Sequence, residues 1–386
     1  MMITPSTIAI FEQVMKQYAA ELRQIGLTID REPDRLTEFL HTSALQAINH
    51  MMIPPEYGGQ PIVTIGQDRY YGLSSLERVI TIEQLSAGDA GVFLGGPGPS
   101  MSSIVMIDLG DEEQKERFYS HFLKGPAWAV FALSEPEKGS DATEISTRIT
   151  RHPDGRMELT GHKFYIGNGH RASIGLVFAQ TNRTPLGIQV AIVDPSLPGF
   201  TATPLDTMGL RGLQLSHLQF EAFPLEEKDI LGRHLSPTKR GLWGALRTFH
   251  RMRPSVAALA LGVAQAAYDY VVEHRTIFTE REKTELERLE MRLHALRSMI
   301  RNAAAEIDHD ANKGYLASLS KIRAASVAEE ATEWALEMMG PGSMLEHPLL
   351  NKWYRDARAF EFMEGTTSIQ KINVFQAYAN GKMQHV

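Results

Sequence analysis

One carboxylate near the end of the chain stands in a setting that favours acid–base chemistry. Glu364 follows the mostly apolar residues 360–363, so its carboxyl group lies within an apolar run. Loss of hydration in such a run raises the pKa of a carboxyl group toward the range that suits a general base. The residues alone leave a second interpretation equally open. Gly365 can end one helix and Thr367 with Gln370 can cap the next, which would make Glu364 a helix-end residue.

A second candidate site is a loop of small residues that follows an apolar strand. Residues 129–133 predict a buried strand, and Pro136 ends it because proline has no amide hydrogen to give to the sheet. Gly139 and Ser140 then let backbone N–H groups approach a ligand closely, and the side chains of Ser140 and Asp141 can fix it. Taken alone, such a loop is more often an ordinary turn between strands.

The next predicted strand ends beside an aromatic ring and bare backbone. Residues 157–166 have the pattern of a strand, and Tyr165 near its end is followed by Gly167, Asn168 and Gly169. A ring next to glycine backbone offers a flat surface and close backbone approach. The two strand ends together therefore predict a site for a flat heterocycle.

Two other patterns are weak as sites. Residues 95–99 are rich in glycine and proline, but no strand precedes them and no lysine follows at P-loop spacing, so they predict a plain loop. Asp308, His309 and Asp310 carry metal-ligand atoms in a polar stretch without a second cluster, so they predict a solvated helix end and no metal site. Because the chain has no cysteine, disulfides, thiolate metal sites and a cysteine nucleophile are excluded.

The composition is that of a globular protein with two or three subdomains. Of the 386 residues, 43% are hydrophobic and 22% are charged, and a chain of this size exceeds what one core usually fills. The net charge of −7 offers no basic surface for nucleic acid. The lack of cysteine fits a reducing compartment, so we expect a cytoplasmic protein. Neither a signal sequence nor an apolar run of about 18 residues stands out, so we expect no membrane insertion.

Periodicity divides the chain into three parts of an α+β protein. Residues 1–125 predict helices, the first ending at Gly26; residues 126–236 predict short strands; and residues 237–386 predict helices again. The strands have no helices between them, which favours a small antiparallel barrel or sandwich. The last part contains a bundle-type seam of Leu286, Leu289, Leu293, Leu296, Ile300, Ala303 and Ile307.

The motifs in their order resemble those of the acyl-CoA dehydrogenase family. Residues 134–141 stand where the family has a Thr-Glu-Pro-x-x-Gly-Ser-Asp loop, and residues 165–168 where it has a Trp-Ile-Thr-Asn strand. Arg355-Asp356-Ala357 and Glu364-Gly365-Thr366 resemble its catalytic segment. The resemblance covers nearly the whole chain and implies an α-helical N-terminal domain, a small antiparallel β domain and a C-terminal four-helix bundle.

The resemblance also implies a reaction. In the family, a glutamate at the position of Glu364 removes the α-proton of an acyl thioester while the β-hydride passes to flavin N5. It implies FAD as cofactor, a CoA or carrier-protein thioester as substrate, an electron acceptor, and a homo-oligomer that is a dimer or a tetramer. Some branches take the base from the residue immediately before Arg253, but Met252 stands there, which leaves Glu364 without a rival.

The remaining site residues are likewise implied by the resemblance. For the flavin they are Phe131, Leu133, Ser134, Gly139, Ser140, Tyr165 and Gly167. For the ADP end they are Arg275, Phe278, Glu337 and Thr366, of which Arg275 and Phe278 would reach a neighbouring subunit's FAD. For the substrate they are Ser140, Arg253 and Gly365. The residues alone leave ion pairs or helix packing open for Arg253, Arg275 and Phe278.

The chain departs from the family at the cofactor site. Gly167 replaces a threonine, Glu337 replaces a glutamine, and the segment after Phe278 is short. These changes resemble specialised members that oxidise short acyl groups on carrier proteins in secondary metabolism, including those that make hydroxymalonyl or aminomalonyl extender units. Three alternatives stay open: oxidation of a semialdehyde-type extender unit, a flavin oxidase or monooxygenase on the same fold, and a binding protein without catalysis.

Overall fold

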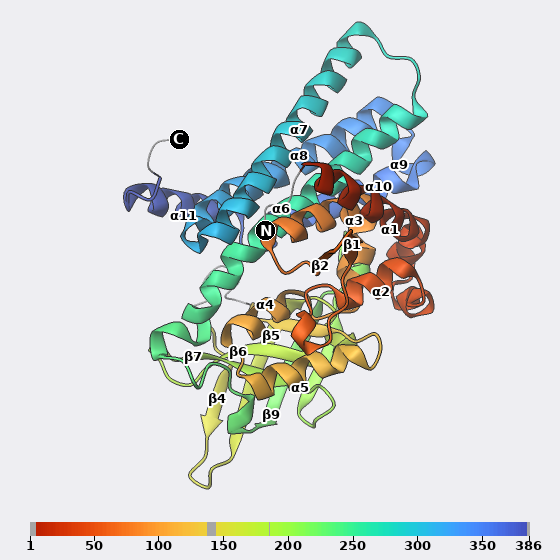
Figure 1. The fold of residues 1–386 in the computed structure, drawn as a ribbon. Coiled ribbons are helices and arrows are strands. Elements are labelled where there is room, and N and C mark those ends of the chain that lie inside the picture. The colour runs from red at the N-terminus through yellow and green to blue at the C-terminus, as the bar shows by residue number, and fades with distance from the viewer. Residues whose placement is uncertain (1–4, 137–143, 185, 384–386) are drawn as a thin grey trace.

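The computed structural model describes residues 5–136, 144–184 and 186–383, and it confirms the predicted α+β class. Helices from the two ends of the chain pack together in the upper part of Figure 1, and the sheet lies below them. One side of the sheet packs on α4 (Ser100–Leu109) and α5 (Glu112–Leu123). There Val105 and Phe118 join Leu176 and Val190 in one apolar cluster. The site therefore has to form where the helical part meets the sheet.

The N-terminal part contains more than the predicted helices. Gly26 does not end the first helix, which continues to Arg31. A Cβ at Gly26 would lie 2.2 Å from Oδ2 of Asp89, so the glycine instead allows α1 and α3 to pack closely. A short hairpin of two strands was not predicted. The elements are α1 Pro5–Arg31, α2 Ser43–His50, β1 Val63–Ile65, β2 Asp68–Tyr70, α3 Ser75–Gly95, α4 Ser100–Leu109 and α5 Glu112–Leu123.

The middle part is one mixed sheet. Its order is β3-β6-β4-β5-β9-β8, with β7 paired to β6. The pairs of β6 with β3 and with β4 are parallel, so the sheet is not wholly antiparallel as predicted; the chain crosses over between these strands instead of turning back at once. The strands are β3 Ala129–Ala132, β4 Arg148–Arg151, β5 Met157–Ile166, β6 Ile174–Gln180, β7 Ile188–Val193, β8 Phe200–Pro204 and β9 Ser216–Leu225.

The C-terminal part is a helical bundle around α6. The predicted seam is on α7, where Leu289 to Ile307 bury their apolar side chains. Residues 248–274 of α6 are long and apolar enough to cross a membrane, but 78% of the apolar 18-residue window within them is buried inside the protein, as in a core helix. The helices are α6 Gly241–His274, α7 Glu280–His309, α8 Gly314–Met339, α9 Ser343–Glu346, α10 Pro348–Ala357 and α11 Thr367–Ala379.

The acidic end of α7 has a structural role. The carboxylate of Asp308 accepts hydrogen bonds from the backbone N–H groups of Ser75 at 2.7 Å and Leu76 at 3.0 Å, so it caps the start of α3. Asp308 is exposed at the helix end, as predicted, but its capping contact with α3 was not predicted. Within the described residues, no group of three or more His, Cys, Asp or Glu side chains could hold a metal ion.

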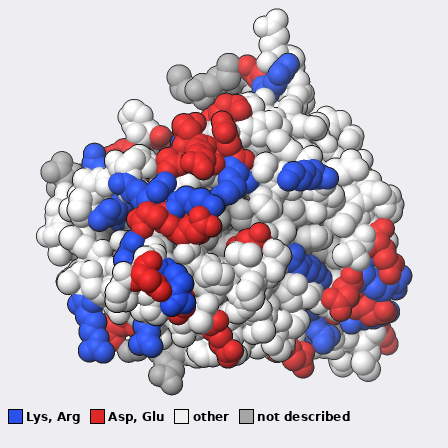
Figure 2. Space-filling model, turned by 90° about the horizontal axis from the view of Figure 1, so that it is seen from below, with Lys and Arg blue, Asp and Glu red and all other residues white. Residues whose placement is uncertain are grey.

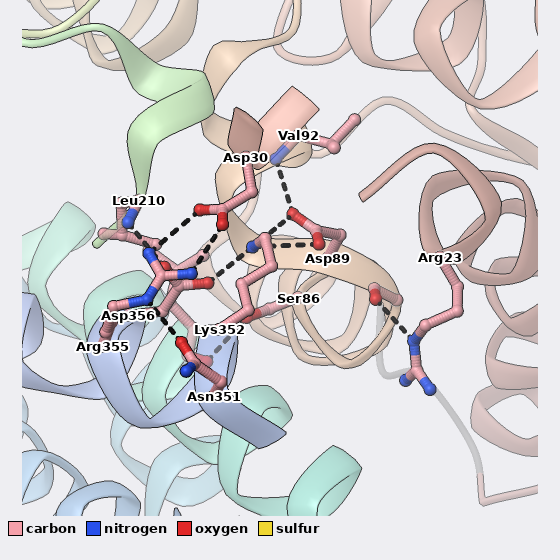
Figure 3. Close-up of polar contacts among 12 residues, drawn as sticks. Arg23, Asp30, Ser86, Asp89, Val92, Leu210, Asn351, Lys352, Arg355 and Asp356 are labelled. Atoms are coloured by element: carbon pink, nitrogen blue, oxygen red, sulfur yellow. Dashed lines mark hydrogen bonds and ion pairs between the residues drawn. The ribbon is translucent and has the colours of Figure 1, made fainter. Parts of the chain in front are cut away.

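A buried ionic cluster joins the three parts of the chain (Figure 3). Nζ of Lys352 on α10 donates to Oδ1 of Asp89 on α3 at 3.0 Å and to Oδ2 of Asp356 at 2.6 Å. Asp356 also accepts from the backbone N–H of Leu210, in the loop that leads into β9, at 2.6 Å. Beside it, Arg355 pairs with Asp30 of α1. One lysine thus fixes helices from both ends of the chain and a loop of the middle part.

The outer surface has a different charge pattern. On the face seen in Figure 2, acidic and basic side chains lie next to one another rather than in separate fields. Exposed pairs of this kind, such as Arg156 with Asp154 and Lys228 with Glu226, contribute little to stability because water and salt screen them. Buried ionic contacts such as this cluster therefore matter more for the fold than the exposed pairs.

Replacing Lys352 should destabilise the protein strongly. In Lys352→Met the carboxylates of Asp89 and Asp356 stay buried without their cation, which should lower the free energy of unfolding by about 3–5 kcal/mol. Urea unfolding at neutral pH measures this loss. The control Lys228→Met removes an exposed pair and should leave the midpoint nearly unchanged; equal midpoints for the two variants would contradict the role of the cluster.

Candidate active site

Glu364 lies in a short left-handed segment between two helical pieces. It follows the 3-10 helix Arg358–Glu361 and precedes α11, and its φ is +55°, with +94° at Gly365. A residue other than glycine adopts this conformation only when its surroundings impose it. Oε2 of Glu364 is buried and has no hydrogen-bond partner among the described residues. The segment thus presents a carboxylate oxygen that the protein itself does not use.

The helix-capping interpretation of this segment is wrong in its details. Thr366 is the N-cap of α11, and the carboxylate of Glu361, not Gln370, accepts hydrogen bonds from the N–H and the hydroxyl of Thr367. The side chain of Gln370 turns inward and donates to the carbonyl oxygen of Glu364 at 2.8 Å. The carboxylate of Glu364 is therefore not part of a capping arrangement.

The surroundings of Glu364 adjust its acidity. Burial raises the pKa of its carboxyl group to about 7, against the opposing charges of Arg253 and Lys321. A pKa near the working pH is what a general base needs, because the group is then both ionised and able to bind a proton. The structure thus brings the predicted substrate residue Arg253 and the predicted base together.

Arg253 also connects the base to the sheet. It lies on α6, where Nη1 is 3.3 Å from Nδ1 of His250 and the guanidinium is 5.9 Å from the ring centre of Phe249. The Phe249 ring in turn meets the ring of Phe131 on β3 at 5.9 Å. Nε of Arg253 is buried without a partner in the described chain. A row of contacts therefore runs from Glu364 to the first strand of the predicted flavin site.

A buried ion pair supports the end of that strand. Nζ of Lys163 on β5 donates to the carbonyl oxygen of Leu133 at 3.0 Å and to Oε1 of Glu135 at 2.8 Å. Glu135 also accepts from the N–H and hydroxyl of Ser146, both at 2.6 Å, and from the N–H of Thr147 at 3.0 Å. These contacts hold the chain on both sides of Ser134. Neither Glu135 nor Lys163 was predicted as a site residue.

The end of β5 exposes the predicted aromatic ring. Tyr165 has a φ of +60° and is 62% exposed although it lies in a strand. At Gly167 a Cβ would lie 2.5 Å from Cδ1 of Leu213, so a threonine could not fit unless Leu213 moved. Asn168 is anchored through its Nδ2, which donates to the carbonyl oxygen of Leu94 at 2.9 Å. The side chain of Leu213 thus leaves no room for the threonine that the family has at the position of Gly167.

The residues predicted at the ADP end lie apart from the base segment, except Thr366. Arg275 ends α6 and donates to the carbonyl oxygen of Met338 at 2.7 Å and to Glu282 at 2.7 Å, with its guanidinium 5.0 Å from the Phe278 ring centre. Glu337 is exposed on the last turn of α8, next to Met338. Contact of these side chains with a neighbouring subunit's FAD stays a prediction. Gly139 and Ser140 lie outside the described residues.

The described residues fit a flavin. An exposed tyrosine ring stands beside glycine backbone at the end of β5, and a braced strand end lies at Leu133 and Ser134. Through Arg253 and Phe249, strand β3 is linked to a buried oxygen of Glu364 that lacks a partner in the described chain, as a proton acceptor for a bound substrate requires. The chain offers backbone, ring and base, which are the parts that a flavin oxidoreductase needs.

Family models match the chain in three consecutive stretches. The acyl-CoA dehydrogenase N-terminal domain matches residues 4–126, the middle domain residues 130–223 and the C-terminal domain residues 239–379. The short-chain specific acyl-CoA dehydrogenase of Megasphaera elsdenii is 30% identical, over 82% of this chain and 82% of its own. The 3-(aryl)acrylate reductase of Clostridium sporogenes is 28% identical, over 91% of this chain and 93% of its own.

Solved structures agree with these matches. The butyryl-CoA dehydrogenase from Megasphaera elsdenii superposes with a TM-score of 0.81 at 26% identity, covering 96% of this chain and 98% of that chain. The prolyl acyl carrier protein oxidase AnaB has the same fold, with a TM-score of 0.82 at 21% identity over 97% and 99% of the two chains. The chain belongs to the acyl-CoA dehydrogenase family. It is a flavoprotein oxidoreductase, and FAD is its cofactor.

The acid stability of the protein should depend on Glu135. Burial raises the pKa of this carboxyl group, but Lys163 and the donors of Ser146 outweigh burial and lower it from 4.5 to about 2. As pH falls below about 4.5 the unfolded chain binds a proton first, so the stability that Glu135 contributes is lost between there and about pH 2.

The test compares thermal unfolding of two variants across that pH range. Glu135→Gln should be less stable at neutral pH and should lose less stability on acidification than the wild type. The comparison Ser146→Ala removes one of the hydrogen bonds that lower this pKa but keeps the charge of Glu135, so it should reduce the acid dependence less than Glu135→Gln does. A Glu135→Gln curve parallel to the wild type at every pH would contradict this account.

Proposed function

We propose that the protein oxidises an acyl thioester between its α and β carbons. Glu364 takes the α-proton, the β-hydride leaves with its electron pair, and a carbon–carbon double bond forms between the two carbons. FAD, when bound, supplies the acceptor for that hydride. An external electron acceptor must then remove the two electrons so that the enzyme can turn over again.

One observation carries this proposal. The carboxylate of Glu364 combines burial, a pKa raised to about 7 and an oxygen without a partner in the described chain. A carboxylate with only a structural role would accept hydrogen bonds from other groups of the protein, as those of Glu361 and Asp356 do. Glu364 instead has a carboxylate oxygen that accepts no hydrogen bond from the described chain, which supports its role as the base.

Other groups of the chain complete the chemistry. The α-proton of a thioester is a weak acid, so the carbonyl oxygen needs a donor when negative charge develops on it, and one such donor is worth about 3–4 kcal/mol. We assign this role to the backbone N–H of Glu364, whose left-handed segment is held from behind by Gln370. Arg253 adds a nearby positive charge.

The carrier of the acyl group is proposed from the relatives. The names of the Megasphaera relatives specify CoA thioesters, and that of AnaB specifies an acyl carrier protein. The two Megasphaera relatives, at 26% and 30% identity, are named for CoA thioesters, whereas the Clostridium relative at 28% is named for an arylacrylate. We propose a short acyl-CoA as the first substrate to test. Carrier-protein thioesters, including extender-unit types, form the second series of the same assay.

Removing the basicity of Glu364 should abolish oxidation. Glu364→Gln keeps the size of the side chain and should leave FAD binding nearly intact. The rate of flavin bleaching by substrate should decrease by about 10⁴-fold, the upper end of the range of about 10²–10⁴ for a general base. Anaerobic stopped-flow absorbance measures this rate, and α-deuterated substrate should slow the wild type. A rate that responds neither to the substitution nor to deuterium would exclude α-proton removal by Glu364.

We also propose that the enzyme is a homo-oligomer. Large apolar side chains are exposed at two places on the C-terminal helices: Ile277 after α6, and Phe362, Phe375 and Tyr378 on or just before α11. Apolar surface of this kind commonly marks contacts between proteins. Arg275 is two residues from Ile277. A second subunit that covers Ile277 would therefore also lie close to Arg275, which the resemblance assigns to the FAD of that second subunit.

Hybrid oligomers can test whether a site is shared. An Arg275→Ala subunit should bind FAD weakly when alone, and a Glu364→Gln subunit should be inactive. Co-expressed together, the two should recover part of the activity, because the Glu364→Gln subunit supplies Arg275 to its neighbour. No recovery in hybrids that are shown to be mixed by mass spectrometry would place Arg275 at its own subunit's site or at none.

A further inference from the structure

A buried lysine lies directly behind the base segment. Lys321 on α8 is 1% exposed, and its Nζ donates to the carbonyl oxygens of Glu361 at 2.6 Å and Gly365 at 2.8 Å. These acceptors are backbone groups, so they offset only part of the cost of removing an ammonium group from water. A hydrophobic residue would fill the same space at a lower cost. The charge and the two hydrogen bonds therefore call for another explanation than packing.

The two carbonyls that Lys321 binds are on either side of Glu364. One ends the 3-10 helix before the base and the other belongs to Gly365, whose φ is +94°. A second side chain holds the carbonyl between them: Gln370 donates to Glu364, and its Oε1 accepts from the hydroxyl of Ser318 at 2.8 Å. Lys321 and Ser318 are one turn apart on α8. One face of α8 thus holds the strained segment in place.

Charged and titratable groups lie near Glu364 on α6, on α8 and in the preceding turn. From α6 come Arg253 and, beside it, His250; from α8 comes Lys321. Glu361 of the preceding turn faces Lys321, but its carboxylate is engaged with Thr367. Burial alone would favour the neutral form of Glu364, and the two cations oppose it. Lys321 is the one of these cations that also touches the backbone of the base segment.

We propose that Lys321 is a positioning residue for the base: its hydrogen bonds fix the backbone that flanks Glu364, and its charge favours the ionised carboxylate. This inference rests on the proposed function of Glu364. Without Lys321 the left-handed segment can relax and turn the carboxylate away from the substrate. Without its charge, a larger fraction of the enzyme carries a protonated base at neutral pH.

The absence of cysteine from the chain allows a test with matched side chains. Lys321→Cys, unfolded and then refolded after aminoethylation, regains an ammonium group at nearly the length of lysine. The same variant treated with a methylthiolating reagent carries an uncharged side chain that is one atom shorter than lysine. Infrared difference spectra with ¹³C-labelled glutamate, assigned by Glu364→Gln, report the titration of Glu364 without turnover.

The aminoethylated protein should resemble the wild type in titration and in rate. In the methylthiolated protein the titration midpoint of Glu364 should rise by about one pH unit. The apparent pKa of the acid limb in the pH profile of the flavin-reduction rate should rise by the same amount. The exposed Lys371→Cys, given the same two reagents, should shift neither. Equal midpoints in the two Lys321→Cys adducts would overturn the role of the charge.

Ser318→Ala separates the hydrogen bonds from the charge and remains informative if the neutral adduct does not refold. It frees Gln370 from its anchor and keeps the ammonium of Lys321, so the maximal rate should fall several-fold while the titration of Glu364 stays at the wild-type midpoint. An unchanged rate would overturn the positioning role. If Glu364→Gln itself keeps its rate, the proposed reaction fails, and the infrared shift still decides whether Lys321 controls the charge of Glu364.

Discussion

The arrangement of the site depends on the charge of Lys352, which is shut away from water between Asp89 and Asp356. An ammonium group at this depth is stable only with close carboxylates, so the contact fixes α10 against α3 with little freedom. Asp356 extends the constraint to Leu210 and thus to the loop whose Leu213 packs on Gly167. The chain after α10 leads directly to Glu364, so base and flavin strand share one anchor.

The three nearly buried lysines of the described chain form a graded series. Lys352 has two carboxylates, Lys163 has one carboxylate and one carbonyl, and Lys321 has two carbonyls. Each binds a different part of the site: the helix before the base, the strand end at the flavin, and the base segment itself. The positive charge is thus least compensated beside Glu364, where an excess of it opposes the effect of burial on the carboxylate.

Periodicity was enough to predict the helical N- and C-terminal parts and the strands of the middle part, because apolar spacing follows directly from burial. It did not predict the β1–β2 hairpin, and the assignment of Glu364 as the base came from the family resemblance. Nor could periodicity predict the buried lysines. Lys321 stands in a helix of small residues and reads as part of a solvated face, and only tertiary contacts show that this face meets Glu361 and Gly365. The prediction for Gly26 failed, and the capping contact of Asp308 was missed, for the same reason: the role of each is set by a partner more than 60 residues away.

The acidity of Glu364 shows what such an arrangement achieves. A shift from 4.5 to about 7 corresponds to roughly 3 kcal/mol of preference for the protonated form. Since the folded-state pKa is raised, this carboxylate lowers the stability of the fold once the pH exceeds that of ordinary carboxyl titration. The fold tolerates the cost because Lys352 and Lys163 hold the surrounding elements independently of it. The proposed base therefore lies in a segment whose backbone Lys321 binds directly, between elements that Lys352 and Lys163 hold in place.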